Sequence, residues 1–127
     1  MDKKPKILIV EDDEALRSMY VERFQKEKFD VVSVINGEDA VEVALREVPT
    51  IVLLDLFLPK KGGLSVLEVL KSQPATRDIP VVILTAYPRE EYKDKSIRDG
   101  ATLFLSKSDV VPGEVVEKVK EIIAEQN

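Results

Sequence analysis

The 127-residue sequence contains no cysteine and no histidine. Without cysteine the chain can form no disulfide and offers no thiol nucleophile. Because histidine is missing as well, zinc sites of the Cys/His kind and serine–histidine catalytic triads are excluded. Whatever chemistry the chain performs must therefore come from oxygen-bearing or cationic side chains.

Long apolar runs and phosphate-binding glycine motifs are also missing. No apolar run approaches the ~18 residues that a membrane-spanning helix requires. The start, MDKKPKILIV, is basic and then apolar, but the acidic run that begins at Glu11 ends it too early for a signal peptide, so we expect a cytoplasmic protein without membrane contact. The five glycines form neither G-x-x-x-x-G-K-[ST] nor G-x-G-x-x-G. The net charge of −5 argues against a nucleic-acid partner.

Strand-like and helix-like segments alternate along the whole chain. Apolar strands are expected at 6–10, 29–35, 51–54, 80–85 and 102–105, and strands that are apolar throughout are typical of a parallel sheet covered on both faces. A helical pattern follows each strand. We predict one α/β domain over residues 1–127, a doubly wound five-stranded parallel sheet in the flavodoxin-like order 2-1-3-4-5, with five helices on both faces.

The helical pattern differs in strength between the second and the fourth predicted helices. In the second helix the pattern predicts one inward face, made of Ala40, Val41, Ala44, Leu45 and Val48. The fourth helix, predicted over 88–99, is highly polar and has the weakest pattern of the five.

Polar side chains stand at the carboxyl ends of four predicted strands. Glu11 and Asp12 follow the first strand, Asp55 ends the third, Thr85 ends the fourth, and Lys107 lies just past the fifth. Open α/β sheets bind ligands at this edge, so these side chains are expected to converge on one crevice. Asp55 is the most unusual of them, because neither a helix cap nor a turn explains an acid inside IVLLDLFLP.

The residue types at these strand ends suggest phosphoryl chemistry. Carboxylates so close together repel one another unless a cation lies between them, and a hard divalent ion such as Mg²⁺ prefers oxygen ligands. A lysine ammonium such as that of Lys107 suits a phosphate or carboxylate group, and the Thr85 hydroxyl can donate to a phosphoryl oxygen. An aspartate nucleophile, a Mg²⁺ site and a lysine are the parts of an acyl-phosphate centre.

Taken singly, most of these residues have simpler explanations. The acidic run 11–14 can favour a helix N-terminus, Thr85 can be an ordinary strand residue, and Lys107 can be a solvated surface lysine. Their joint position at the ends of four strands favours the site.

The sequence resembles the receiver domain of two-component response regulators over nearly its whole length. ILIVEDDEALR is similar to the acidic-pair segment of that family, LLDLFLPKKGGLSVL to its phosphorylation-site segment, and ILTAY and LFLSK to its threonine and lysine segments. The resemblance implies that Asp55 accepts a phosphoryl group. It also implies that Mg²⁺ is held by Asp12, Asp55 and the Phe57 carbonyl, with Glu11 binding through water.

The same resemblance implies roles outside the metal site. Thr85 would be the switch hydroxyl, Phe104 the switch aromatic residue and Lys107 the contact to the phosphate, while Phe57 and Tyr87 would flank the approach of water to the phosphoryl group. A sensor histidine kinase or histidine phosphotransfer protein must supply the group, since the chain has no histidine. We expect a stand-alone signalling domain rather than an enzyme, monomeric or weakly dimeric when phosphorylated, which acts on a downstream protein of unknown identity.

One departure from the family pattern leaves two other functions open. Ser108 follows Lys107 where the family usually has proline after a cis bond, and because a cis bond before a non-proline residue costs ~3 kcal/mol, we expect a trans bond and a changed loop through 109–111. A loop that disables the site would leave a phosphorylation-independent scaffold. A Mg²⁺-dependent phosphohydrolase is the other alternative, although such enzymes typically carry a second acid at the position of Phe57.

Overall fold

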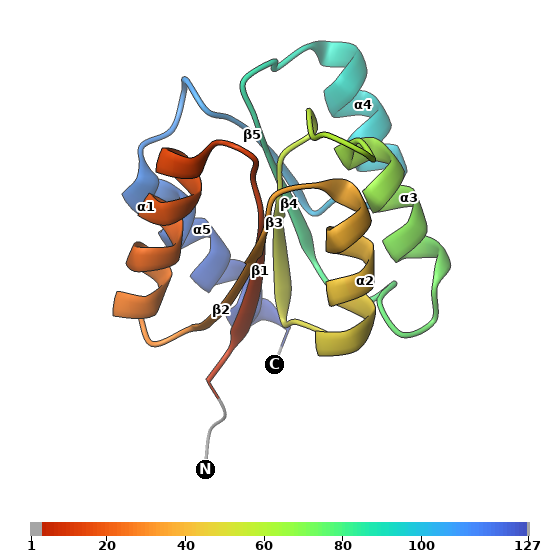
Figure 1. Ribbon diagram of the computed structural model, residues 1–127. Helices are drawn as coiled ribbons and strands as arrows, with labels where there is room; N and C mark the ends of the chain where they lie inside the picture. The colour runs from red at the N-terminus through yellow and green to blue at the C-terminus, as the bar shows by residue number, and fades with distance from the viewer. Residues whose placement is uncertain (1–3, 127) are drawn as a thin grey trace.

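A five-stranded parallel sheet runs through the computed structural model, which describes residues 4–126, and helices cover both faces of the sheet (Figure 1). The elements follow one another as strand and helix in strict alternation. In chain order they are β1 (Lys6–Val10), α1 (Glu14–Lys26), β2 (Asp30–Val34), α2 (Gly37–Glu47), β3 (Ile51–Leu54), α3 (Gly63–Ser72), β4 (Val81–Thr85), α4 (Glu90–Arg98), β5 (Leu103–Ser106) and α5 (Pro112–Glu125).

The strands are arranged in the order β2-β1-β3-β4-β5, which confirms the predicted topology. Each neighbouring pair is parallel, and β1 lies between β2 and β3 with Val10 opposite both Val34 and Leu54. All carboxyl ends therefore lie at one edge of the sheet, the upper edge in Figure 1. Glu11, Asp12, Asp55 and Lys107 lie in the loops that leave β1, β3 and β5 at this edge, and Thr85 is the last residue of β4.

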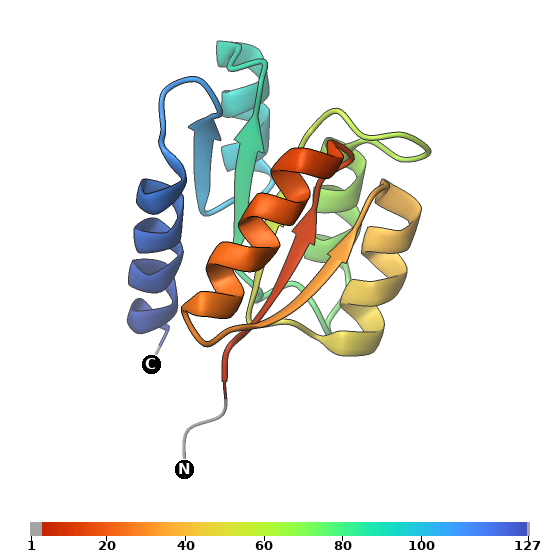
Figure 2. The ribbon, with the colours of Figure 1, turned by 60° about the vertical axis from the view of Figure 1, so that its left-hand side comes forward.

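Alternate strand residues face two separate cores, which explains why the strands are apolar throughout. Helices α2, α3 and α4 cover one face, and α1 and α5 cover the other (Figures 1 and 2). The first core contains Leu8, Val10, Val52 and Leu54, together with α2 and α3 residues such as Val66, Leu67 and Leu70. The second contains Ile7, Ile9, Ile51 and Leu53, together with Phe24 and the α5 residues Val115, Val116, Val119 and Ile122.

The predicted inward face of α2 was wrong at its far end. Ala40 and Ala44 are buried as predicted, but Leu45 is 41% exposed and Val48 is 51% exposed, while Val43 is buried in their place. The buried stripe follows the spacing i, i+3, i+4, so Leu45 points away from the sheet. Val48 is not helical, since it ends α2 as a C-cap in the left-handed conformation, with φ at 42°.

The ends of some elements lie one residue from their predicted positions. Strand β5 ends at Ser106 rather than 105, so Lys107 follows it directly. Helix α4 forms in the polar segment 88–99, and the one residue it buries is Ser96, whereas Ile97 is 46% exposed. This polar helix therefore buries no apolar residue fully, although Tyr92 packs half-buried against the core.

The start of α3 fixes the backbone that carries Asp55. The Gly63 N–H donates to the Leu56 carbonyl at 2.8 Å. A Cβ atom at Gly63 would overlap the Asp55 carbonyl oxygen and would lie 2.6 Å from the Leu56 Cα. Only glycine allows α3 to approach the β3 end this closely.

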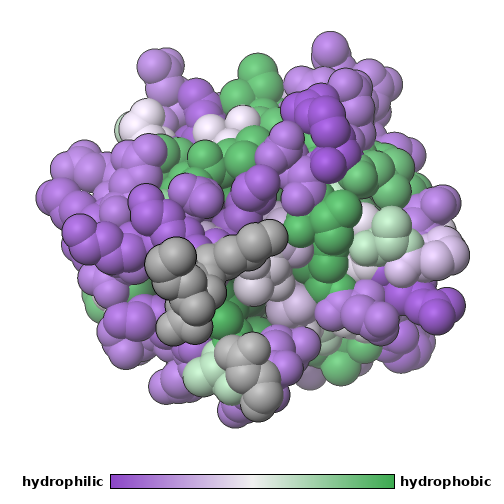
Figure 3. Space-filling model, turned by 90° about the horizontal axis from the view of Figure 1, so that it is seen from below, coloured by the Kyte–Doolittle hydropathy of each residue, from purple (hydrophilic) through white to green (hydrophobic). Residues whose placement is uncertain are grey.

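The opposite end of the molecule, seen from below in Figure 3, carries the amino ends of the strands. Hydrophilic residues cover much of this face, with apolar residues exposed between them. Here the Lys6 ammonium pairs with the Glu47 carboxylate at 2.8 Å. No helix within residues 4–126 has the length and apolar character needed to cross a membrane.

Candidate functional site

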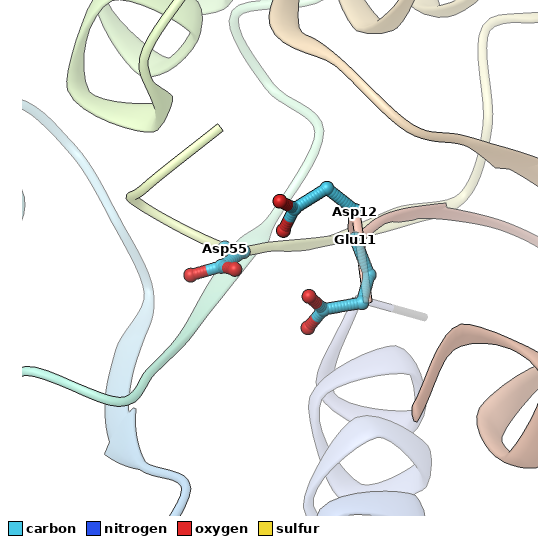
Figure 4. Close-up of side chains that lie close together, drawn as sticks. All are labelled: Glu11, Asp12 and Asp55. Atoms are coloured by element: carbon cyan, nitrogen blue, oxygen red, sulfur yellow. The ribbon is translucent and has the colours of Figure 1, made fainter. Parts of the chain in front are cut away.

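Three carboxylates meet at the upper edge of the sheet. Glu11, Asp12 and Asp55 each present an oxygen, and these oxygens all lie within 4.8 Å of one another, the side chains turning toward a common space (Figure 4). Glu11 is 5% exposed and Asp55 is 6% exposed, whereas Asp12 is open to solvent. In residues 4–126 this is the only group of three acidic side chains close enough to share a metal ion.

Backbone hydrogen bonds between neighbouring strands bring these acids together. The Glu11 N–H donates to the Val34 carbonyl at 3.1 Å, and the Asp55 N–H donates to the Val10 carbonyl at 3.1 Å. Both residues thus extend the hydrogen-bonded ladders of β1 by one step past the strand ends. The sheet itself, rather than a flexible loop, positions both buried acids.

Helix α1 does not use Glu11 or Asp12 as its cap. Its N-cap is Asp13, whose Oδ1 accepts from the Leu16 N–H at 2.8 Å, and Glu14 is the first residue of the helix. The Asp13 N–H in turn donates to Glu11 Oε2 at 3.2 Å. Favouring a helix N-terminus therefore explains the last two acids of the run 11–14 but not the first two.

Lys107 reaches into the carboxylate cluster. Its Nζ lies 2.8 Å from Glu11 Oε1 and 3.2 Å from Asp55 Oδ2, and its side chain is only 21% exposed. Burial alone would lower the pKa of this ammonium, but its hydrogen bond to Glu11 and the negative charges of Asp55 and Glu11 raise the pKa above the ordinary 10.5. Lys107 is therefore a charged group of the site rather than a solvated surface lysine.

The cluster still carries more negative than positive charge. Burial raises the pKa of Glu11 above its ordinary 4.5. The hydrogen bond from Lys107 lowers this pKa in part, and the nearby Asp55 charge raises it further. Three carboxylates face a single ammonium. The donor set consists of oxygens only, and the exposed Asp12 leaves room for water, so these residues fit a hard divalent cation such as Mg²⁺.

Thr85 is fully buried at the end of β4, beside Lys107. Its carbonyl accepts from the Lys107 N–H at 2.8 Å, and its Oγ1 accepts from the Tyr87 N–H at 3.1 Å. Because the oxygen acts as an acceptor in that contact, the hydroxyl hydrogen stays available for donation.

Phe104 lies away from the carboxylates. It pairs with Ile83 in the β4–β5 ladder and packs, half-buried, against the core under α2 and α3. It also lines a hollow of about 220 Å³ toward the start of α4. The structure thus gathers the predicted acids and Lys107 in one cluster, whereas Phe104 lies within β5, three residues before Lys107.

An aromatic cluster begins at Phe57, two residues after Asp55. The Phe57 N–H points at Asp55 Oδ1 across 3.4 Å, and the Phe57 ring packs edge-on against Tyr87, with centroids 4.7 Å apart, and against Tyr92, with centroids 5.5 Å apart. Tyr92 lies on α4, the helix whose sequence pattern is the weakest of the five. No sequence signal connects it to Phe57, because the contact depends on how α4 packs beside the β3–α3 loop.

The peptide bond between Lys107 and Ser108 is trans, as expected, and no peptide bond within residues 4–126 is cis. With serine rather than proline at position 108, Lys107 still contacts both Glu11 and Asp55.

Comparisons with known proteins identify a common family. The sequence model of the response regulator receiver domain matches residues 7–120. The chain is 34% identical over 118 residues to the phosphate regulon transcriptional regulatory protein PhoB of Klebsiella pneumoniae, covering 93% of this chain and 51% of PhoB. It is 35% identical over 102 residues to the response regulator PleD of Caulobacter vibrioides, covering 80% of this chain and 22% of PleD.

The fold matches solved structures of the same kind. A response regulator receiver domain protein (CheY-like) from Methanospirillum hungatei superimposes with a TM-score of 0.91 at 26% identity, covering 98% of this chain and 97% of that one. The chain spans about half of PhoB and less than a quarter of PleD, so the remaining parts of those proteins have no counterpart in the match.

Proposed function

The chain belongs to the response regulator receiver domain family, and we propose that it accepts a phosphoryl group from a phosphohistidine donor onto Asp55 with Mg²⁺ bound beside it. One observation carries the proposal. The buried Asp55 carboxylate lies 3.2 Å from the Lys107 ammonium, which also pairs with Glu11, and one of its oxygens lies within 4.8 Å of oxygens of Glu11 and of the exposed Asp12. A strand-end acid in this position is surrounded by the charges that phosphoryl transfer needs.

The proposed transfer assigns a task to each side chain. An Asp55 carboxylate oxygen attacks phosphorus while the P–N bond of the donor breaks and its electron pair stays on the imidazole nitrogen. The Lys107 ammonium, now shared between Glu11 and Asp55, neutralises the incoming phosphoryl oxygens. The Thr85 hydroxyl donates its free hydrogen to one of them.

Mg²⁺, when bound, would neutralise phosphoryl charge and orient the oxygens for in-line attack. Asp12 and Asp55 would bind it directly, together with the Phe57 carbonyl, and Glu11 would bind through water. The close approach of the three carboxylate oxygens supports this assignment.

The proposed partners follow from the family. A sensor histidine kinase or histidine phosphotransfer protein in the cytoplasm would supply the phosphoryl group, and the phosphorylated chain would contact a downstream protein, as a monomer or a weak dimer. Thr85 and Phe104 would transmit the effect of phosphorylation to the surface. Phe104 lies on β5, the strand that ends at Ser106, directly before Lys107.

Incubation with Mg²⁺ and acetyl phosphate, followed by intact-mass measurement, tests the proposal. Acetyl phosphate replaces the protein donor, so the partner does not need to be known. We expect one phosphoryl group per chain, and none when Mg²⁺ is removed with a chelator. Release of inorganic phosphate without a lasting adduct would point instead to a phosphohydrolase. Neither adduct nor turnover would point to a phosphorylation-independent scaffold.

Mg²⁺ is expected to stabilise the unphosphorylated protein against heat. The ion relieves repulsion among the carboxylates and binds only the folded chain, which gives about 1.4 kcal/mol at a concentration roughly ten times the dissociation constant. Thermal unfolding with and without Mg²⁺ measures the effect. Asp12→Ala should abolish it, and Asp94→Ala, at an exposed aspartate of α4, should not. An equal rise in the Asp12 variant would contradict the assigned ligands.

A further inference from the structure

Two serines on either side of Lys107 bond to each other. The Oγ atoms of Ser106 and Ser108 lie 2.9 Å apart, and the Ser108 N–H lies 3.3 Å from Ser106 Oγ. Ser106 is 7% exposed, whereas Ser108 is at the surface. The buried Ser106 hydroxyl accepts a hydrogen bond from the Ser108 N–H and can donate its own hydrogen to the Ser108 Oγ. Both bonds therefore span Lys107, which lies between the two serines.

The backbone of Lys107 is fixed from the other side as well. Its N–H donates to the Thr85 carbonyl at 2.8 Å, and the Asp109 N–H donates to the Ser106 carbonyl at 3.1 Å. Lys107 is thus the first residue past β5, and it lies inside a turn. The hydroxyl and the carbonyl of Ser106 each accept a hydrogen bond that closes this turn. The direction in which its side chain leaves the sheet is set by that turn.

The direction matters because a lysine stem is flexible. Four rotatable bonds separate the ammonium from Cα, and holding them in one geometry costs side-chain entropy. The ammonium nevertheless meets two separate carboxylates, at 2.8 Å and 3.2 Å. A small rotation of the backbone at Lys107 would move Nζ out of reach of at least one of them.

We propose that Ser106 is a positioning residue for Lys107, and that the bonded serine pair holds this turn in the conformation that aims the ammonium at Glu11 and Asp55. The inference rests on the proposed function for the reaction that Lys107 assists. One of the bonds that hold the turn comes from the Ser108 N–H, which a proline at position 108 would lack.

A pair of substitutions in two backgrounds tests this role. Ser106→Ala is expected to slow phosphorylation by acetyl phosphate about fivefold to tenfold, the loss typical of one buried hydrogen-bonded group. In the Lys107→Ala background the same change should have no further effect, because there is no ammonium left to position. Ser106→Thr keeps the hydroxyl and should restore the rate. Equal slowing in both backgrounds, or no slowing in either, would overturn the proposal.

Two further measurements keep the result clear. Ser108→Ala changes an exposed residue, so it should fold and should slow the reaction in the same direction, by less. The NMR signals of the Lys107 side chain, assigned by their loss in Lys107→Ala, should move toward those of exposed lysines in Ser106→Ala and stay in place in Ser106→Thr. This readout needs no phosphorylation, so it decides the role of Ser106 even if wild type takes up no phosphoryl group. An unchanged Lys107 signal in Ser106→Ala would overturn the proposal.

Discussion

Asp55→Asn is expected to take up no phosphoryl group while keeping the fold. An asparagine amide is not a nucleophile toward phosphorus, so uptake should fall from one group per chain to none. The stability of the Mg²⁺-free protein should stay the same or rise, because the change removes the charge of one of three carboxylates that lie close together, and Lys107 keeps its 2.8 Å contact with Glu11. Intact mass after acetyl phosphate treatment and thermal unfolding in chelator measure the two effects.

The control for this variant is Asp94→Asn, which makes the same chemical change at an exposed aspartate of α4. It should be phosphorylated like wild type. Full uptake by Asp55→Asn would rule out Asp55 as the acceptor. A large loss of stability in that variant would instead show that the Asp55–Lys107 ion pair is a structural necessity.

Replacing Phe57 with Asn and Tyr87 with Glu is expected to shorten the life of the phosphorylated protein by about 10²-fold, the scale of acid–base assistance to hydrolysis. Hydrolysis needs a water in line behind phosphorus. Phe57, whose backbone N–H donates to Asp55 Oδ1 at 3.4 Å, forms an edge-on ring pair with Tyr87, with centroids 4.7 Å apart. Neither ring is placed to orient water in the way that a carboxylate or amide could. The decay of the phosphorylated mass after removal of acetyl phosphate measures the rate.

Tyr92→Leu is the control for the Phe57–Tyr87 ring pair. It removes the second ring contact of Phe57, at 5.5 Å, without adding a group that orients water. Its decay rate should stay near that of wild type. If the phosphorylated double variant decays no faster than phosphorylated wild type, the two rings only pack against the loops. Equally fast decay of Tyr92→Leu would show that loop mobility, rather than water access, sets the rate.

The sheet and most of the site could be predicted because the signals are local. Each strand is a short apolar run, and a polar residue directly after such a run must lie at the carboxyl edge of a parallel sheet. That is why Glu11, Asp12, Asp55 and Lys107, which are far apart in sequence, could be expected in one cleft.

Features that depend on packing between elements could not be predicted. The contact between Phe57 and Tyr92 follows from the position of α4. The bond between Ser106 and Ser108 requires the turn after β5 to be known first. Composition and periodicity contain none of these distances.

The position of the phosphoryl group in wild type is the most direct test of the account. After treatment with Mg²⁺ and acetyl phosphate, borohydride reduces an aspartyl phosphate to homoserine, which peptide mass mapping locates in the sequence. We predict homoserine at position 55 and nowhere else. A phosphate that resists reduction on Thr85 or a serine, or homoserine at position 12 with Asp55 intact, would contradict the account.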